Sequence, residues 1–266
     1  MSQRGREPRR EPIEVTSTGA SVTVDRKPAT KFTMQDPAVP RVYQAATEEK
    51  PHGSEAYAEK NKDKTVLQQH VIFWDQDNDG VIWPSDTYKG FRDLGFNPIF
   101  SLIAVVIIHA TFSYPTGLAK SYLPDPFFRL LVPSMHKAKH GSDSATFDNE
   151  GRFLPSKFED IFTKYDRDYK GGLTWTEIWA AMSGYRIIMD PFGWFALFFE
   201  FGTTYLLCRD QDGVVEKEDM RKVYDGSLFF EIRDMNREAS KGRGKGWTKG
   251  FGPLDAVKAA RSYAGF

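Results

Sequence analysis

The chain has little cysteine and no excess of charge. Cys208 is the single cysteine among 266 residues, so an internal disulfide is excluded and a reducing compartment is expected. The 36 basic and 36 acidic residues leave a formal net charge of zero. Such a chain has no long-range field that would attract nucleic acid, so the sequence predicts no nucleic-acid partner and only local attraction to anionic lipid.

The first residues lack a secretory signal and a myristoylation signal. The start MSQRGREPRR is charged and no apolar run follows it, and residue two is a serine. From Met1 to Lys62 the composition is rich in Pro, Glu, Lys, Arg and Thr, without hydrophobic periodicity. We therefore predict a mostly disordered N-terminal arm.

No apolar run is long enough to cross a bilayer by itself. The longest, residues 99–112, lies between Pro98 and Pro115, and a spanning helix needs roughly 20 apolar residues. A lipid-inserted hairpin, a monolayer anchor and a buried core helix all remain open. His109 within this run needs a polar partner in an apolar environment.

An acidic loop at residues 75–86 has the pattern of a calcium-binding EF-hand. Oxygen-bearing side chains stand at positions one, three and five, Gly80 stands at position six, and helical patterns flank the loop. The predicted ligands are Asp75, Asp77, Asp79, the carbonyl of Val81, and Asp86. Asp86 replaces the longer glutamate usual at position twelve, which leaves weaker calcium binding or magnesium binding open.

Two further segments repeat the loop pattern in degenerate form. Residues 166–177 carry Lys170 at the fifth ligand position, and an ammonium cannot ligate a cation. Residues 208–219 carry Cys208 at the first position. We expect both to be metal-free hands with which the intact hand can pair.

Histidines and aromatic residues mark a second possible site. His70 shares the apolar face of a predicted helix, residues 65–74, that enters the acidic loop. Spacing alone does not predict a haem site at His70 or at any other of the five histidines. The aromatic block at 192–208 is a lipid-facing or cofactor-lining element, and Glu200 within it requires a wet or paired side.

Several separate strings make the chain resemble the caleosin family. They keep the family's order over roughly residues 65–230, which makes a chance match implausible. The strings are LQQHV at 67–71, the acidic loop, YKGFRDLG at 88–95, PDPFF at 124–128, HKAKHGSDS at 136–144, GRFLPSKF at 151–158 and YDGSL at 224–228.

The resemblance implies an enzyme. Caleosins bind one calcium ion and a b-type haem, and they transfer oxygen from hydroperoxides to unsaturated fatty acids or other acceptors. The resemblance therefore implies a calcium-dependent haem peroxygenase whose partners are fatty acid hydroperoxides, unsaturated lipid acceptors and a phospholipid monolayer or membrane. The expected locations are the lipid droplet surface and the endoplasmic reticulum, with the cytosolic face of other membranes and a homo-oligomer also open.

By the same resemblance, the family's two haem-associated histidines correspond to His70 and His140. His136, one helical turn before His140, is a reserve ligand. A bound hydroperoxide needs an open position on the iron, so one of the two is expected as the ligand and the other as a labile ligand or a distal acid–base group. The family's proline knot is reduced here to Pro124-Asp-Pro126, which weakens the expectation of droplet targeting.

The expected fold is mainly α, with EF-hand-like helix–loop–helix units and an apolar membrane-associating segment. The expected regions are a disordered arm (1–62), a calcium-binding hand (63–97), an apolar segment with a proline-rich turn (98–135), a helical region with two degenerate hands (136–235) and a flexible tail (236–266). A non-catalytic lipid-droplet coat protein and a calcium sensor that exposes its aromatic surface are the alternative functions.

Overall fold

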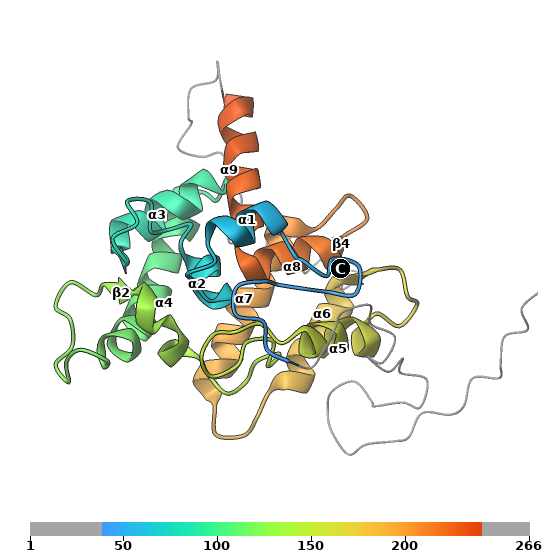
Figure 1. Cartoon of the computed structure of the whole chain (residues 1–266), viewed down its shortest axis with the longest axis horizontal. Helices are drawn as coiled ribbons and strands as arrows, with labels where there is room; N and C mark the ends of the chain where they lie inside the picture. The colour runs from blue at the N-terminus through green and yellow to red at the C-terminus, as the bar shows by residue number, and fades with distance from the viewer. Residues whose placement is uncertain (1–38, 241–266) are drawn as a thin grey trace, which may run out of the picture.

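A computed structural model describes residues 39–240, and the fold is mainly helical, as predicted (Figure 1). The helices are α1 (Glu55–Lys60), α2 (Val66–Val71), α3 (Pro84–Asp93), α4 (Pro98–Gly117), the 3-10 helix η2 (Val132–Ala138), α5 (Pro155–Tyr165), α6 (Trp175–Tyr185), α7 (Pro191–Cys208), α8 (Lys217–Asp225) and α9 (Ser227–Ser240). The short strands are β1 (Val81–Ile82), β2 (Leu130–Leu131), β3 (Gly172–Thr174) and β4 (Val214–Glu216).

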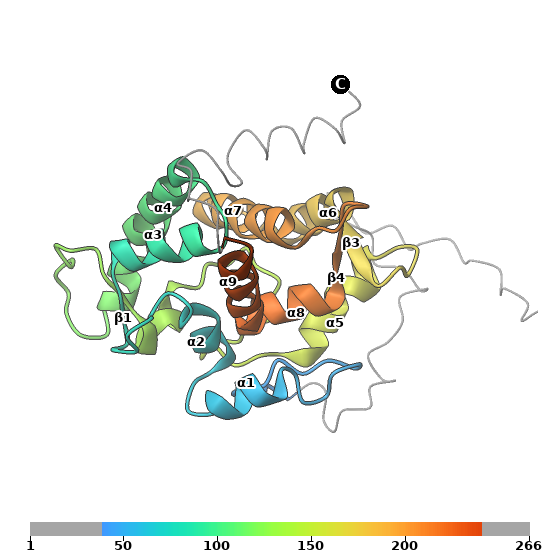
Figure 2. The ribbon, with the colours of Figure 1, turned by 90° about the horizontal axis from the view of Figure 1, so that it is seen from above.

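The short strands form two antiparallel pairs at opposite ends of the molecule (Figure 2). The two degenerate loops pair with each other, Leu173 opposite Val215. The acidic loop pairs instead with the segment after the proline-rich turn, Val81 opposite Leu131. The expectation that the degenerate hands would pair with the intact one is therefore wrong. Helix α3, which follows β1, packs on α4, and β2 also packs on α4. This arrangement brings β2 close enough to satisfy the backbone groups of β1.

The predicted disordered arm, 1–62, includes ordered residues. Residues 1–38 lie outside the described part, but between residues 41 and 62 the chain makes contacts with the core. Arg41 exchanges backbone hydrogen bonds with Phe153, and Ala45 is buried. The buried Arg221 donates to the Ala45 carbonyl and to the hydroxyl of Ser54. These contacts come from distant parts of the chain, so local composition did not reveal them.

The apolar helix α4 is longer than the sequence pattern predicted. It starts where the Asn97 side chain accepts from the amide of Phe100, and it continues through Pro115 to Gly117. It packs on α3 and η2, so it is not a lipid-inserted hairpin. Among the described residues, α4 alone is long and apolar enough to cross a membrane, and 33% of its 18-residue apolar window is buried. The interpretation that it is too short to span is therefore wrong by length.

His109 has the polar partners that its position in α4 requires. Its Nε2 lies 2.8 Å from the hydroxyl of Thr87 on α3, and its Nδ1 lies 2.6 Å from the carbonyl oxygen of Phe128. The imidazole is buried, and burial lowers its pKa, partly offset by the Phe128 carbonyl. His109 therefore joins α4 to α3 and to the proline-rich turn.

The predicted flexible tail, 236–266, also includes ordered residues. Helix α9 runs to residue 240, and the Asn236 amide donates to the Asp93 carbonyl at the end of α3. Arg237 forms an ion pair with the Asp93 carboxylate at 2.9 Å. Residues 236–240 are therefore helical, and the rest of the predicted tail, 241–266, lies outside the described residues.

Candidate functional site

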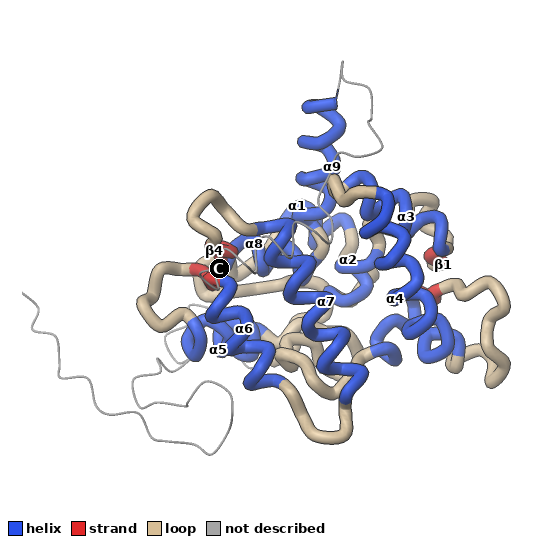
Figure 3. Tube along the Cα trace, turned by 180° about the vertical axis from the view of Figure 1, so that it is seen from behind, coloured by secondary structure: helices blue, strands red, loops and turns tan. Residues whose placement is uncertain are grey.

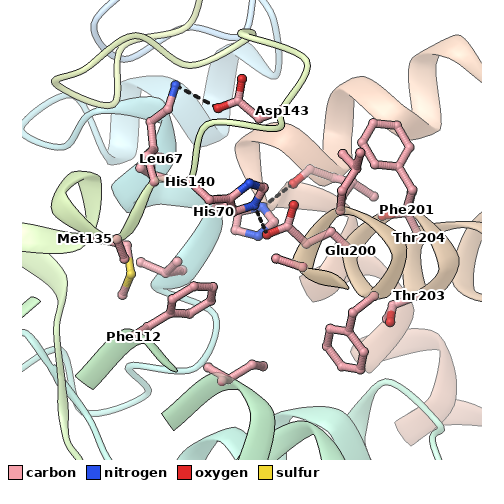
Figure 4. A pocket seen from close by; sticks show the side chains of 18 of the residues that line it. Leu67, His70, Phe112, Met135, His140, Asp143, Glu200, Phe201, Thr203 and Thr204 are labelled. Carbon is pink, nitrogen blue, oxygen red and sulfur yellow. Dashed lines mark hydrogen bonds and ion pairs between the residues drawn. The ribbon is translucent and has the colours of Figure 1, made fainter. Parts of the chain in front are cut away.

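A cavity of about 290 Å³ lies between α2, α4, α7 and the loop that follows η2 (Figure 4). Most of its wall is apolar, including Phe112, Phe195 and Phe199. The chemically active side chains of the wall are His70, Lys139, His140, Asp143, Glu200 and Tyr224. An apolar cavity with a few converging polar groups is the common form of a small-molecule site.

His70 is held in one orientation by a backbone carbonyl. It lies in the last turn of α2, which begins with a capping box between Thr65 and Gln68. Its Nδ1 is 2.7 Å from the carbonyl oxygen of Val223 on α8. A carbonyl can only accept, so Nδ1 carries the proton and Nε2 keeps its lone pair. Burial lowers the pKa of His70, partly offset by the Val223 carbonyl, which favours the neutral form that binds metals.

Gly226 allows α2 to lie against the end of α8. Its φ of +81° is in the left-handed region that ends a helix with little strain only for glycine. A Cβ atom there would lie 2.6 Å from the Gln69 carbonyl oxygen and 2.8 Å from the Cα of His70. Close approach at Gly226 and the Val223 carbonyl together set the position of His70.

The segment after His140 fixes that histidine to two helices. The amide of Ser142 donates to the carboxylate of Asp190, which caps α7, at 2.7 Å. The hydroxyl of Ser144 lies 2.8 Å from the hydroxyl of Tyr224 on α8. Burial raises the pKa of Tyr224 to about 12, so its hydroxyl stays protonated. In the Gly-Ser-Asp-Ser string, Ser142 therefore binds the start of α7 and Ser144 binds α8.

His140 faces a carboxylate on α7. Its Nε2 is 3.4 Å from Oε1 of Glu200, and its buried Nδ1 has no hydrogen-bond partner in the described structure. Burial lowers the pKa of His140, but the hydrogen bond and charge of Glu200, with the charges of Asp143 and Asp190, outweigh burial and raise it. The pKa values of His70 and His140 are therefore shifted in opposite directions, a pattern typical of separate roles in acid–base chemistry.

Two of the three histidines predicted at the site line the cavity. Figure 4 shows His70 and His140 approaching the same space, with Glu200 beside them. His136 lies on η2 and is not part of the cavity wall. The sequence required a wet or paired side at Glu200, the single charged residue in the 18-residue α7, but it did not identify His140 as the partner.

The acidic loop brings three carboxylates together. One oxygen from each lies within 4.8 Å of the others, and they belong to Asp75, Asp77 and Asp79. Asp75 is buried, and it accepts from the amides of Asp79 at 3.1 Å and Gly80 at 3.0 Å. Gly80 has a φ of +80°, and Val81 begins β1. Three carboxylates at this spacing suit a hard divalent cation.

The structure does not bring Asp86 into this carboxylate group. One oxygen of Asp86 accepts from the amide of Trp83 at 3.1 Å, and the other lies 3.1 Å from the ammonium of Lys89. Its side chain thus caps its own helix. In the second loop, Glu177 caps Thr174 with one oxygen and reaches the loop interior with the other. The extra methylene of glutamate accounts for this difference.

Lys170 occupies the interior of the second loop. Its ammonium lies 3.1 Å from Asp166, 2.7 Å from Asp168 and 2.8 Å from Glu177. Burial lowers the pKa of Lys170, but its three carboxylate partners together raise it. The ammonium supplies the positive charge that a metal ion would supply in an intact loop. In the third loop, Cys208 is buried and its pKa is raised by burial, which disfavours a thiolate ligand.

Comparisons with known proteins give one consistent family. The sequence profile of the family described as "Caleosin related protein" matches residues 62–233. A peroxygenase of Lilium longiflorum is 37% identical over 231 residues, which cover 86% of this chain and 95% of the relative. Probable peroxygenase 4 of Arabidopsis thaliana is 38% identical over 171 residues, which cover 64% of this chain and 87% of the relative.

A third relative, also from Arabidopsis thaliana, is described as a probable inactive peroxygenase-like protein. It is 34% identical over 159 residues, which cover 59% of this chain and 74% of the relative. No solved structure matches the chain significantly. The profile covers the cavity and the acidic loop, because both lie between residues 62 and 233.

Proposed function

This chain belongs to the caleosin family, and on that premise we propose that it is a calcium-dependent haem peroxygenase. It transfers oxygen from fatty acid hydroperoxides to unsaturated lipids or other acceptors. The observation that carries the proposal is a single apolar cavity whose wall holds a neutral, oriented His70 and, apart from it, the His140–Glu200 pair.

The residues of the cavity fit haem b. His70 offers Nε2 as an iron ligand, because the Val223 carbonyl already engages its Nδ1. The apolar wall suits the porphyrin face. When bound, the haem supplies the chemistry that breaks the O–O bond of a hydroperoxide. We assign His70 as the iron ligand and His140 as the distal acid–base group.

The chain's own residues would then bind and orient the substrates. Aromatic side chains of α7, among them Phe192, Phe195 and Phe199, form one wall along which an acyl chain can lie. The same apolar surface excludes water from the reacting atoms. His140 is the wall residue best placed to move a proton, because its pKa is raised and its imidazole is hydrogen-bonded to Glu200.

We further propose that calcium at the acidic loop stabilises the His70 site. Four residues separate His70 from Asp75, and α2 leads directly into the loop. An ion held by Asp75, Asp77 and Asp79 would therefore restrain the end of α2. Excess chelator should shift the haem absorption spectrum and lower the rate. An unchanged spectrum and rate would contradict the coupling.

Helices α4 and α7 together form the surface that we propose docks on a phospholipid monolayer of lipid droplets or the endoplasmic reticulum. The two helices lie side by side, with α7 between α4 and α6, and Phe100 stacks on Phe199 at 6.0 Å (Figure 3). Seven of their exposed apolar side chains, which we call the α4–α7 face, are Ile99, Leu102, Ile103, Val106, Trp194, Phe195 and Phe198. Exposed apolar side chains gathered on two neighbouring helices are typical of a membrane or protein contact.

Liposome flotation tests this docking. Val106→Asp and Phe198→Asp should each lower the bound fraction, because each places a charge on the α4–α7 face. Met235→Asp, at an exposed position of α9, is the matched control and should bind as the wild type does. Equal binding by all four proteins would exclude the α4–α7 face as the docking surface.

The alternative function is that of a non-catalytic coat protein. It is favoured by the similarity to a relative described as probably inactive. An absorption spectrum of protein produced with a haem supply, followed by cumene hydroperoxide and an oxidisable dye, separates the two. We expect a Soret band and dye oxidation, both lost or strongly reduced in His70→Ala. Wild-type protein without haem and without oxygen transfer would overturn the peroxygenase proposal.

A further inference from the structure

Glu200 is the one carboxylate of the cavity wall that is free to exchange a proton with a bound substrate. Its Oε1 contacts Nε2 of His140, and its side chain is 49% exposed on the cavity wall. The second oxygen, Oε2, has no hydrogen-bond partner within residues 39–240. An apolar helix therefore places its single charge beside the proposed distal histidine.

The other charged groups near His140 already have fixed partners. Asp143 binds the ammonium of Lys139 at 3.1 Å. Asp190 accepts from the amides of Ser142 and Gly193 at the start of α7. The buried Nδ1 of His140 has no hydrogen-bond partner among residues 39–240, and the Phe192 ring lies edge-on to the imidazole with 6.1 Å between ring centroids.

His70 and Tyr224 complete the set of titratable groups near His140 on the cavity wall, and the Tyr224 hydroxyl lies 2.8 Å from the hydroxyl of Ser144. The Val223 carbonyl engages Nδ1 of His70, and Nε2 is the proposed iron ligand, so His70 does not compete for the Glu200 proton. Of these neighbours, Glu200 alone combines a contact to His140 with an unbonded oxygen.

We propose that Glu200 and His140 act as a proton-relay pair in oxygen transfer, with Glu200 as a catalytic base. This inference rests on the peroxygenase function proposed above and deepens it. Glu200 accepts the O–H proton of the hydroperoxide R–O–O–H, and protonated His140 donates a proton to the R–O oxygen. The sequence pattern and the similarity to known proteins do not assign Glu200 the role of a catalytic base.

The proton and electron balance of this scheme closes. The O–O bond breaks, the R–O fragment leaves with the bonding pair and becomes R–OH with the His140 proton, and the other oxygen passes to the acceptor. The acceptor is oxidised by two electrons and the hydroperoxide is reduced by two. The proton on Glu200 then moves across the 3.4 Å contact to His140, and the pair returns to its starting state.

The first test needs no haem. In apoprotein with labelled histidine, an NMR titration should give a lower pKa for His140 in Glu200→Gln than in the wild type, because the favourable charge is gone. Glu200→Asp should fall between them. Glu59→Gln is the control, because it removes an exposed carboxylate of α1 that lies outside the cavity. His140 should titrate in this variant as it does in the wild type.

The second test measures how the O–O bond breaks. With haem-loaded protein and cumene hydroperoxide, paired-electron cleavage gives 2-phenyl-2-propanol, whereas one-electron cleavage leads to acetophenone. Loss of a positioned proton acceptor should lower the rate by roughly 100-fold or more and raise the acetophenone share in Glu200→Gln. Haem content and thermal unfolding should match those of Glu59→Gln.

The outcomes separate the two proposals. An active wild type together with an unchanged His140 titration and product ratio in Glu200→Gln overturns the relay alone. A changed titration with an unchanged product ratio also overturns it, since the contact would then be electrostatic only. A wild type that neither binds haem nor transfers oxygen overturns the peroxygenase proposal, and the catalytic role of Glu200 with it.

Discussion

The Nδ1 atom of His70 lies 2.7 Å from the backbone carbonyl oxygen of Val223, 153 positions away in the sequence. This hydrogen bond joins the helix that enters the acidic loop to the helix that follows the third loop. It selects the imidazole tautomer that leaves Nε2 for a metal. The position of Val223 depends in turn on how α8 ends at Gly226.

Replacing Gly226 by alanine should therefore move His70. The new Cβ would meet the backbone of Gln69 and His70, and the left-handed conformation would add strain. We expect a loss of roughly 2 kcal/mol or more in the free energy of unfolding and weaker haem binding. Denaturant unfolding and haem titration measure the two effects.

Gly202→Ala is the matched control, because nothing lies within 4 Å of a Cβ placed at that position of α7. This variant should be as stable as the wild type or slightly more stable, since alanine favours a helix over glycine. Equal stability and equal haem affinity in the two variants would show that close approach at Gly226 is unimportant.

The pH dependence of stability should differ between His70 and His140. The pKa of His140 is raised in the fold, so its stabilising contribution is complete below the unfolded pKa of about 6.5 and is lost as pH rises through the higher folded pKa. Wild type should therefore exceed His140→Gln in unfolding free energy most clearly at acidic pH. If the difference in unfolding free energy between wild type and His140→Gln were the same at acidic and at higher pH, the raised pKa of His140 would be contradicted.

The pKa of His70 is lowered, so the sign is opposite. As pH falls from about 6.5 toward the lower folded value, the unfolded state binds more protons and the fold loses stability. Protonation of His70 also removes the lone pair of Nε2. Haem should therefore dissociate at acidic pH, and spectrophotometric titration measures this. Retention of haem through full protonation of His70 would exclude this histidine as the ligand.

Asp86→Glu should strengthen calcium binding at the first loop. Glutamate can cap Trp83 with one oxygen and reach the loop interior with the other, as Glu177 does in the second loop. We expect roughly a tenfold gain in calcium affinity and a smaller change for magnesium, by calorimetry. Asp86→Asn should bind no better than the wild type. A lower affinity in Asp86→Glu would mean that Asp86 already serves as a ligand.

Lys170→Asn should leave three carboxylates of the second loop without their cation. Asp166, Asp168 and Glu177 would then repel one another, so metal-free protein should lose about 1 kcal/mol of stability. Calcium should restore that loss by binding the new oxygen set. A variant whose stability is unchanged and insensitive to calcium would show that the ammonium is not needed in this loop.

Local features of the fold were readable from the sequence because they depend on neighbours along the chain. The spacing of Asp75, Asp77 and Asp79 sets a carboxylate cluster within five residues, and His70 sits one turn before it. The apolar spacing of α5 follows from the periodicity of helices. These patterns concern backbone angles and side-chain faces, which neighbouring residues specify.

Contacts between distant segments required the tertiary structure. Composition could not reveal that residues 39–62 are ordered, because the stabilising partners, Phe153 and Arg221, come from elsewhere in the chain. Pairing of β1 with β2 likewise depends on which backbone edge is nearest in space. The sequence by itself determined the acidic loop, the mainly helical character of the chain after residue 62 and the family, since local spacing and order encode them. Only the tertiary structure decided that Val223 orients His70 and that Glu200 meets His140, because hydrogen bonds between remote groups depend on where the folded chain places them.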